Sequence, residues 1–141
     1  ESFAGGLFHT GDVGYLDEQG FLFLTGRKSD MFISGGSNVY PREIEEAIQT
    51  FPGVAQTCVV GVPDPDWGEV GVAVVEMETP VAQADRAQLG AELKAFLKER
   101  LAGYKVPKEY VLVDALPVTA YGKIARKELR AELSEGRGRA R

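Results

Sequence analysis

Four short polar segments carry residue types that could take part in chemistry. In the first, Phe8-His9-Thr10-Gly11-Asp12, a carboxylate beside a glycine turn could accept hydrogen bonds from two vicinal ribose hydroxyls. Taken alone, this segment is better explained by a local turn bond between Asp12 and Thr10 than by ribose binding. The second segment, residues 25–30, offers Arg27, whose planar guanidinium could reach a sugar or a phosphate. Taken alone, a solvated charged loop between two strands is the better interpretation.

The third and fourth segments combine glycine with polar side chains. Gly35-Gly36 precedes a predicted helix, and small residues there let backbone N–H groups approach a phosphate or a narrow ligand. This is not a Walker loop, because the Gly-Lys-Ser/Thr ending is absent, and most double glycines only form turns. In residues 117–126, Lys123 follows Gly122 and could present a point charge to a phosphate oxygen. By itself it is better explained as a surface lysine beginning an amphipathic helix.

Composition and charge exclude several classes of function. The chain has 141 residues, of which 44% are hydrophobic and 26% charged, as expected for one ordinary globular domain. Its net charge is −5, and the last six residues hold three arginines, so the rest of the chain is more acidic still. An acidic body disfavours general binding to nucleic acid or anionic membranes. No apolar run approaches the roughly 20 residues of a membrane helix, and no signal peptide is visible.

The numbers of cysteines and histidines exclude further kinds of site, namely disulfides and several metal sites. Cys58 is the only cysteine and His9 the only histidine, which rules out an intrachain disulfide, a cysteine-cluster metal site and a multi-histidine metal site. We therefore expect no metal site and a cytoplasmic setting. Because the chain begins at Glu1 without Met, we expect it to be a piece of a longer protein.

The elements that must position these residues follow from periodicity and turn signals. Residues 14–24 predict a β-hairpin with Asp17-Glu18-Gln19-Gly20 as its turn. Later strands are predicted at residues 31–34, 54–62, 70–75 and 110–113, with a flexible loop at 35–38 and a turn at 63–66. One helix is predicted to begin at Pro41, a second to open with a capping box of Asp85 and Gln88, and a short third to carry Leu129 and Leu133.

This order predicts an α+β fold. From residue 31 it is β-α-β-β-α-β followed by a helix, the split βαβ order, which is typical of a two-layer sandwich. We expect the hairpin to precede this core and the arginine-rich residues 136–141 to be disordered.

Considered together, the four segments resemble a known superfamily. A His-Thr-Gly-Asp motif, a Gly-Arg about fifteen residues later, an Ile-Ser-Gly-Gly-x-Asn-Val-Tyr-Pro block and a final Pro-x-x-x-x-Gly-Lys-Ile-x-Arg occur in that order. Residues 7–133 thereby resemble the carboxyl-terminal part of acyl-adenylate-forming enzymes, which include acyl-CoA synthetases, aryl-CoA ligases, beetle luciferases and peptide-synthetase adenylation domains. The Ser-Gly-Gly block is most similar to that of acyl- and aryl-CoA ligases.

The resemblance implies a two-step activity and a role for each motif. ATP and a carboxylic acid give an acyl-adenylate and pyrophosphate, and coenzyme A then takes the acyl group. Asp12 and Arg27 would hold the ribose of ATP, and Lys123 would be the adenylation lysine. Ser34, Gly35 and Gly36 would line the pantetheine tunnel. Ser29 would be the hinge of a rotating domain, where the commonest family residue is Lys or Asp.

The resemblance also implies a division of the chain. Residues 1–28 would end a large amino-terminal domain, residues 29–135 would form the small mobile domain, and the tail would follow. The acid pocket and most contacts to ATP and Mg²⁺ would then lie outside the chain, which alone is expected to be inactive. The competing interpretation is a stand-alone ligand-binding or regulatory α+β module, which has no need of both Asp12 and Lys123.

A few further residues remain open at this stage. Six basic residues are candidates to meet the phosphates of coenzyme A, with solvated surface as the alternative for each: Arg42, Lys98, Lys105, Lys108, Arg126 and Lys127. Trp67 could stack on an adenine, although packing at the edge of the core is the better expectation. Cys58 is expected to be a small buried hydrophobe.

Overall fold

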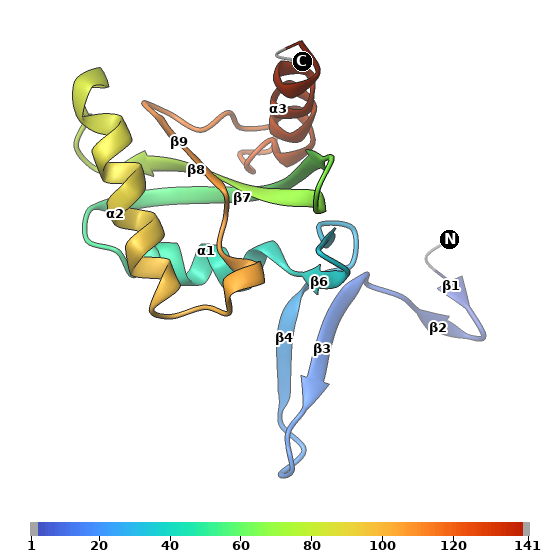
Figure 1. The fold of residues 1–141 in the computed structure, drawn as a ribbon. Coiled ribbons are helices and arrows are strands. Elements are labelled where there is room, and N and C mark those ends of the chain that lie inside the picture. Colours follow the sequence, from blue (N-terminus) through green and yellow to red (C-terminus); the bar gives the residue numbers. More distant parts are fainter. Residues whose placement is uncertain (1–2, 140–141) are drawn as a thin grey trace.

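A β-hairpin arm and a helix-covered sheet make up the chain (Figure 1). The computed structural model describes residues 3–139. Strands β1 (Phe3–Ala4) and β2 (Leu7–Phe8) form a first short hairpin, and β3 (Asp12–Leu16) and β4 (Leu22–Arg27) form the second, as predicted. The Oδ1 atom of Asp17 accepts hydrogen bonds from the backbone N–H groups of Gln19 and Phe21, both at 2.9 Å, which closes the turn of the second hairpin.

The second hairpin protrudes from the body of the molecule (Figure 1). Most of its large apolar side chains are exposed. These are Tyr15, Leu16, Phe21, Leu22, Phe23 and Leu24. Contact with the body is made at its base, where Gly26 lies against Tyr40 and Arg42. A two-stranded hairpin with an uncovered apolar surface has little stability of its own in water.

Strand β8 is the centre of a five-stranded sheet. β7 (Val54–Asp64) pairs antiparallel along the whole of β8 (Gly68–Met77). On the other edge of β8, β9 (Glu109–Val113) runs parallel to Val72–Glu76, and β5 (Phe32–Ser34) meets only Gly68, through Ser34. The short β6 (Ser37–Val39) completes the sheet beside β5.

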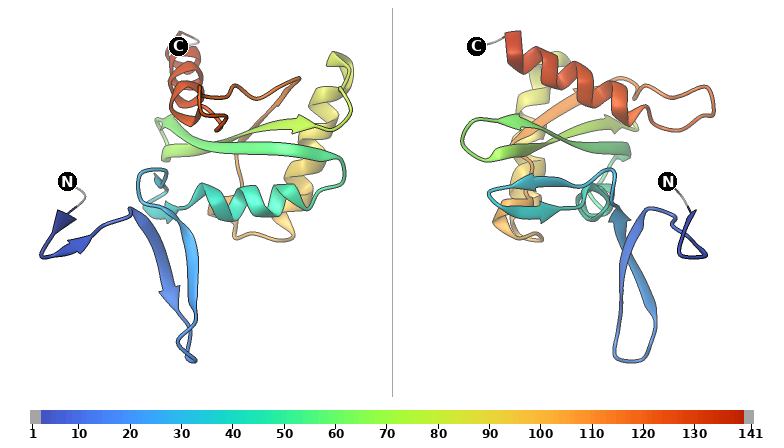
Figure 2. Two further views of the ribbon diagram at one scale, coloured as in Figure 1. Left: turned by 180° about the vertical axis from the view of Figure 1, so that it is seen from behind. Right: turned by 90° about the vertical axis from the view of Figure 1, so that its right-hand side faces the viewer.

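Helices cover both faces of this sheet (Figure 2). α1 (Pro41–Gln49) and α2 (Arg86–Lys98) bury Ile44, Ile48, Leu93 and Leu97 against one face, and α3 (Arg126–Arg139) buries Leu129 against the other. Burial on both faces explains why residues 58–62 of β7 and residues 70–75 of β8 are unbroken runs of small and apolar residues, rich in valine, rather than alternating with polar residues. Short 3₁₀ turns at Gln83–Asp85 and Gly103–Lys105 flank α2.

The α+β class is confirmed, but the layers and strand order differ from the expectation. The final helix adds a third layer, on the face opposite α1 and α2. β8 and β9 are direct parallel neighbours joined through α2, whereas a split βαβ unit places another strand between them. The reason is the length of β5, whose single pair with β8 leaves the rest of that edge open to β9.

Three local predictions were wrong. Residues 37 and 38 lie in β6 rather than in a flexible loop, because Gly35 and Gly36 alone close the turn. The capping box does not form, since Asp85 makes no side-chain cap bond and the Gln88 amide instead donates to Glu92 at 3.2 Å. Residues 136–139 are helical, not disordered, while residues 140–141 lie outside the described part of the chain.

Candidate functional site

The first candidate pair, Asp12 and Arg27, is formed by hairpin register. The two residues face each other across β3 and β4, with Arg27 Nε 3.6 Å from Asp12 Oδ1. Arg27 Nη2 also donates to the Thr10 carbonyl at 3.0 Å. The local turn bond is present too, but it uses the backbone N–H of Asp12, which donates to Thr10 Oγ1 at 3.2 Å. The Asp12 carboxylate is 40% exposed and remains accessible to a ligand.

Ser29, the expected hinge, is exposed between β4 and β5. Next to it, Asp30 N–H donates to the Arg27 carbonyl at 3.1 Å. A cavity of about 140 Å³ opens beside Ser29, and Arg126, Lys127 and Arg130 of α3 form part of its wall. The connection between hairpin and body is therefore short and turn-like, with space on the α3 side.

The glycine turn joins β5 to β6. Gly35 and Gly36 have φ values of +58° and +82°, a left-handed pair typical of two-residue hairpin turns. Ser34, just before them, is buried and pairs with Gly68. The Gly35 N–H donates to the Trp67 carbonyl at 2.9 Å. The Gly36 position faces open space, so a ligand can approach the backbone there.

Trp67 lies directly against this turn, which the sequence analysis did not anticipate. A Cβ atom on Gly35 would lie 2.9 Å from Trp67 Cε3, so only glycine leaves room for the indole. The ring is 44% exposed, and Lys108 Nζ lies 4.4 Å from its centroid. Trp67 directly precedes the first residue of β8, whose pairing with Ser34 brings indole and glycine turn together. That pairing is a long-range contact without a local sequence signal.

Lys123 lies on a braced turn between β9 and α3. Thr119 Oγ1 accepts hydrogen bonds from the N–H groups of Tyr121 and Lys123, and Val118 pairs with Ile124. Gly122 adopts a φ of +77° at the tip. The Lys123 side chain is exposed, and among the described residues none makes a hydrogen bond or ion pair with its amine. The ammonium group is thus free to meet an anion from outside the chain.

Arg126 does not lie on the solvated surface. Its guanidinium donates to the Val59 carbonyl at 2.6 Å, forms an ion pair with Glu45 at 2.7 Å and lies 3.7 Å from Asp30. Lys105 is similarly paired with Glu43 at 3.0 Å. The charged groups of Arg126 and Lys105 are therefore both paired with carboxylates of this chain. Of the remaining basic candidates, Arg42 pairs with Glu46, whereas Lys98 and Lys127 are exposed.

Two other expectations concern side-chain burial and membrane helices. Cys58 is fully buried, as predicted, and burial raises the pKa of its thiol to about 11. Among the described residues, no helix has the length and apolar character needed to cross a bilayer.

The candidate residues therefore fall into separate groups. Asp12 and Arg27 meet at the base of the hairpin, and the glycine turn meets Trp67, whose ring also contacts Lys108. No recorded hydrogen bond or ion pair in residues 3–139 joins Lys123 to either group. Asp12, Arg27, Gly36 and Lys123 are exposed, whereas Ser34 is buried.

Comparison with known proteins assigns the family. A family model for the AMP-binding enzyme C-terminal domain matches residues 43–123, and the chain belongs to this family. A 2-succinylbenzoate–CoA ligase of Listeria monocytogenes serotype 4b (strain F2365) is 48% identical over 129 residues, which make up 92% of this chain and 26% of the relative. A medium/long-chain-fatty-acid–CoA ligase of Mycobacterium tuberculosis (strain ATCC 25618 / H37Rv) is 43% identical over 141 residues, covering 99% of this chain and 25% of the relative.

The fold is also found in a solved ligase. The o-succinylbenzoate CoA synthetase of Bacillus subtilis, in complex with its acyl-adenylate intermediate, matches with a TM-score of 0.79 and 42% sequence identity. The match covers 92% of this chain and 25% of that one. The chain spans about a quarter of the length of the curated relatives it matches. The resemblance drawn from the four motifs is thus confirmed.

Proposed function

We propose that this chain is the carboxyl-terminal part of an AMP-forming acyl-CoA ligase. The observation that carries the proposal is Lys123, an exposed lysine whose amine has no partner among residues 3–139, on a turn braced by Thr119. A turn held in this way can deliver a positive charge to a phosphate at a defined place. The two curated relatives described above are named for different acids, so we leave the acid as the carboxylate class.

In the proposed first step, a carboxylate oxygen attacks the α-phosphorus of ATP and pyrophosphate leaves. Lys123 stabilises the negative charge that builds on the carboxylate and α-phosphate oxygens, since phosphoryl transfer depends mainly on positioning and electrostatics. The accessible carboxylate of Asp12 accepts hydrogen bonds from the ribose hydroxyls, and Arg27 supports the same sugar. Among the described residues no group of acidic, cysteine or histidine side chains is arranged to hold a metal, so we assign Mg²⁺ mainly to the rest of the ligase.

In the proposed second step, the thiol of coenzyme A attacks the acyl carbon, the bond to the phosphate oxygen breaks, and AMP leaves. Ser34, Gly35 and Gly36 line the path of the pantetheine arm. A thin extended arm needs backbone that it can approach closely, and the open space at Gly36 supports this assignment.

The same proposal divides the chain at Ser29. Residues 1–28 complete a large amino-terminal domain. The rest of that domain, outside this chain, covers the exposed apolar side chains of the β3–β4 hairpin. The body that follows turns about Ser29 to present Lys123 in one step and the glycine turn in the other. We place the ligase in the cytoplasm, where ATP and coenzyme A are supplied.

The test uses Lys123→Ala in the full-length ligase, with the two half-reactions measured separately. We expect pyrophosphate release to fall by about three orders of magnitude, while acyl transfer from a supplied acyl-adenylate survives. Lys127→Ala is the matched control for the pyrophosphate half-reaction, because Lys127 is also exposed and lies only four residues away. If Lys123→Ala leaves both half-reactions intact, the stand-alone binding module becomes the better explanation.

A further inference from the structure

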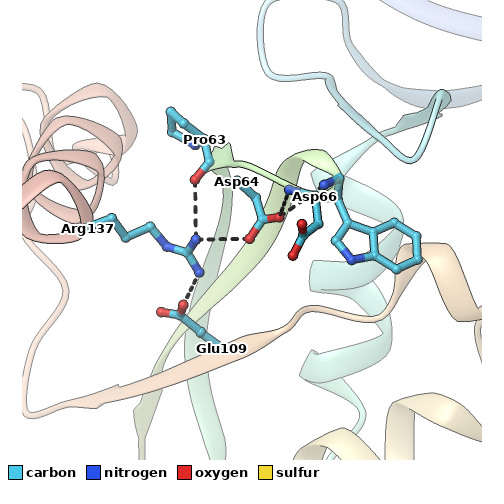
Figure 3. Close-up of polar contacts among 6 residues, drawn as sticks. Pro63, Asp64, Asp66, Glu109 and Arg137 are labelled. Carbon is cyan, nitrogen blue, oxygen red and sulfur yellow. Dashed lines mark hydrogen bonds and ion pairs between the residues drawn. The ribbon is translucent and has the colours of Figure 1, made fainter. Parts of the chain in front are cut away.

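Arg137, near the end of α3, is bound to two segments of the sheet (Figure 3). Its Nη1 donates to the Pro63 carbonyl at 3.3 Å and lies 3.5 Å from Asp64 Oδ2, at the end of β7. Its Nη2 forms an ion pair with Glu109, the first residue of β9. The Arg137 and Asp64 side chains are 22% and 19% exposed, so the contact is largely shielded from water.

Asp64 is held from both sides. Its second oxygen, Oδ1, accepts hydrogen bonds from the backbone N–H groups of Asp66 at 2.9 Å and Trp67 at 3.0 Å. These two backbone bonds, with a smaller contribution from Arg137, lower the pKa of the Asp64 carboxyl group. One carboxylate therefore connects α3 to the turn that carries Trp67.

Glu109 provides the matching connection on the other side. It directly follows Lys108, whose ammonium lies 4.4 Å from the centre of the Trp67 ring. Arg137 thus joins the two segments that supply the tryptophan and the lysine of this cation–π pair. The indole of that pair packs against Gly35 of the glycine turn.

We propose that Arg137 is a positioning residue, which holds Trp67 against the glycine turn and Lys108 over the Trp67 ring, and so sets how well this face binds coenzyme A. The role of this face in binding coenzyme A rests on the proposed function. The positioning itself rests on the contacts of Arg137 with Asp64 and Glu109. A guanidinium suits this place because its planar fork reaches two carboxylates and a carbonyl at once, which an ammonium does not.

The positioning is tested with the fluorescence of Trp67, the only tryptophan of this chain. We expect Arg137→Gln to raise quenching of Trp67 by acrylamide about two-fold, as the ring leaves Gly35 and Lys108. The matched control is Arg130→Gln, which also detaches α3 from the sheet, at the Gly61 carbonyl and at Glu69, but leaves the contacts of Asp64 and Glu109 in place. Equal quenching in the two variants would show that Arg137 only fastens the helix and would overturn the proposal.

Two further variants test whether the contact between Arg137 and Asp64 is responsible for the change in quenching. Arg137→Lys retains the positive charge and serves if Arg137→Gln is too unstable to fold; we expect it to raise quenching as well. Asp64→Asn keeps an oxygen for the two backbone N–H groups but removes the charge that faces Arg137. Combined with Arg137→Gln, it should add little to the change that either variant causes alone. Fully additive changes would contradict a shared contact.

The role of this face in binding coenzyme A is tested in the full-length ligase carrying Arg137→Gln. We expect KM for coenzyme A in transfer from a supplied acyl-adenylate to rise about five-fold, with pyrophosphate release unchanged. A shift in Trp67 quenching without a change in this KM would uphold the positioning and overturn the assignment of this face to coenzyme A. The two failures are therefore distinguishable.

Discussion

At the scale of single residues, Arg126 joins segments that are far apart in the sequence. It comes three residues after Lys123 and reaches Glu45 in α1, Val59 in β7 and Asp30 beside the expected hinge. Burial works to lower the pKa of Arg126, but Glu45 and Asp30 raise it overall, so the guanidinium remains charged. The turn of Lys123 is thereby tied to the body of the domain.

We expect Arg126→Gln to lower the free energy of unfolding of this chain by about 2–3 kcal/mol, because Glu45 is left half-buried without its partner. Urea denaturation followed by circular dichroism measures the loss. The control is Arg42→Gln, which breaks an exposed pair with Glu46 within α1 and should cost less than about 0.5 kcal/mol. A similar small loss in both variants would contradict the structural role of Arg126.

At the scale of elements, the β5–β6 turn combines two demands on glycine. Gly35 and Gly36 both adopt positive φ, but only Gly35 has a neighbour in the way of a side chain, namely the Trp67 ring. Substitutions at these two adjacent positions can therefore distinguish the effect of backbone strain from the effect of close packing.

We expect Gly35→Ala and Gly36→Ala each to destabilise the chain by about 1 kcal/mol through backbone strain. Only Gly35→Ala should also shift the emission maximum of Trp67, because its Cβ displaces the indole. Fluorescence spectra and urea titrations of the two variants provide the comparison. An unchanged Trp67 spectrum in Gly35→Ala would mean that the indole is not seated on the turn.

The β3–β4 hairpin has an uncovered apolar surface and is expected to be unstable in the chain by itself. Amide hydrogen exchange of residues 21–24 should be fast in the monomer and slow when a partner strand or second molecule covers the hairpin. The amides of β7 and β8 serve as the internal control, since both strands are paired and buried. Full protection of residues 21–24 in a monomer would show that the hairpin is stable unaided.

At the scale of the whole molecule, the candidate groups lie on different elements, and within residues 3–139 no hydrogen bond or ion pair joins Lys123 to the other two groups. The glycine turn and the Lys123 turn lie on different elements of a body whose two cores are packed on opposite faces of one sheet, whereas the hairpin base lies on the β3–β4 arm outside both cores. Such a body can turn as a unit and present different surfaces without repacking.

We accordingly expect the purified 141-residue chain to release no pyrophosphate from ATP with any carboxylic acid, because the proposed division of the ligase places the acid pocket outside this chain. A coupled pyrophosphate assay tests this, with the full-length ligase as the positive control. Detectable release that depends on the added acid would overturn the division of labour proposed for the two domains.

Much of the fold follows from local patterns. The helix starting at Pro41, the hairpin turn at Asp17 and the buried valine strands are each determined by residues close together in the chain, and they form where predicted. The capping box at Asp85 failed because a 3₁₀ turn precedes α2 and leaves the Asp85 side chain without its cap bond. The last helical turn of α3 was missed because its anchor, Arg137, binds residues 28 and 73 positions earlier.

The sequence by itself determined the family, the α+β class and the identity of the candidate residues, because motif order and periodicity are properties of neighbouring residues. Tertiary structure alone decided which of those residues meet. It placed Trp67 against the glycine turn and Lys108 over the indole ring, paired Arg126 inside the fold and, within residues 3–139, left the Lys123 amine without a partner. Such contacts depend on strand pairing and helix packing between distant segments, and these minimise the free energy of the whole chain rather than of any local stretch.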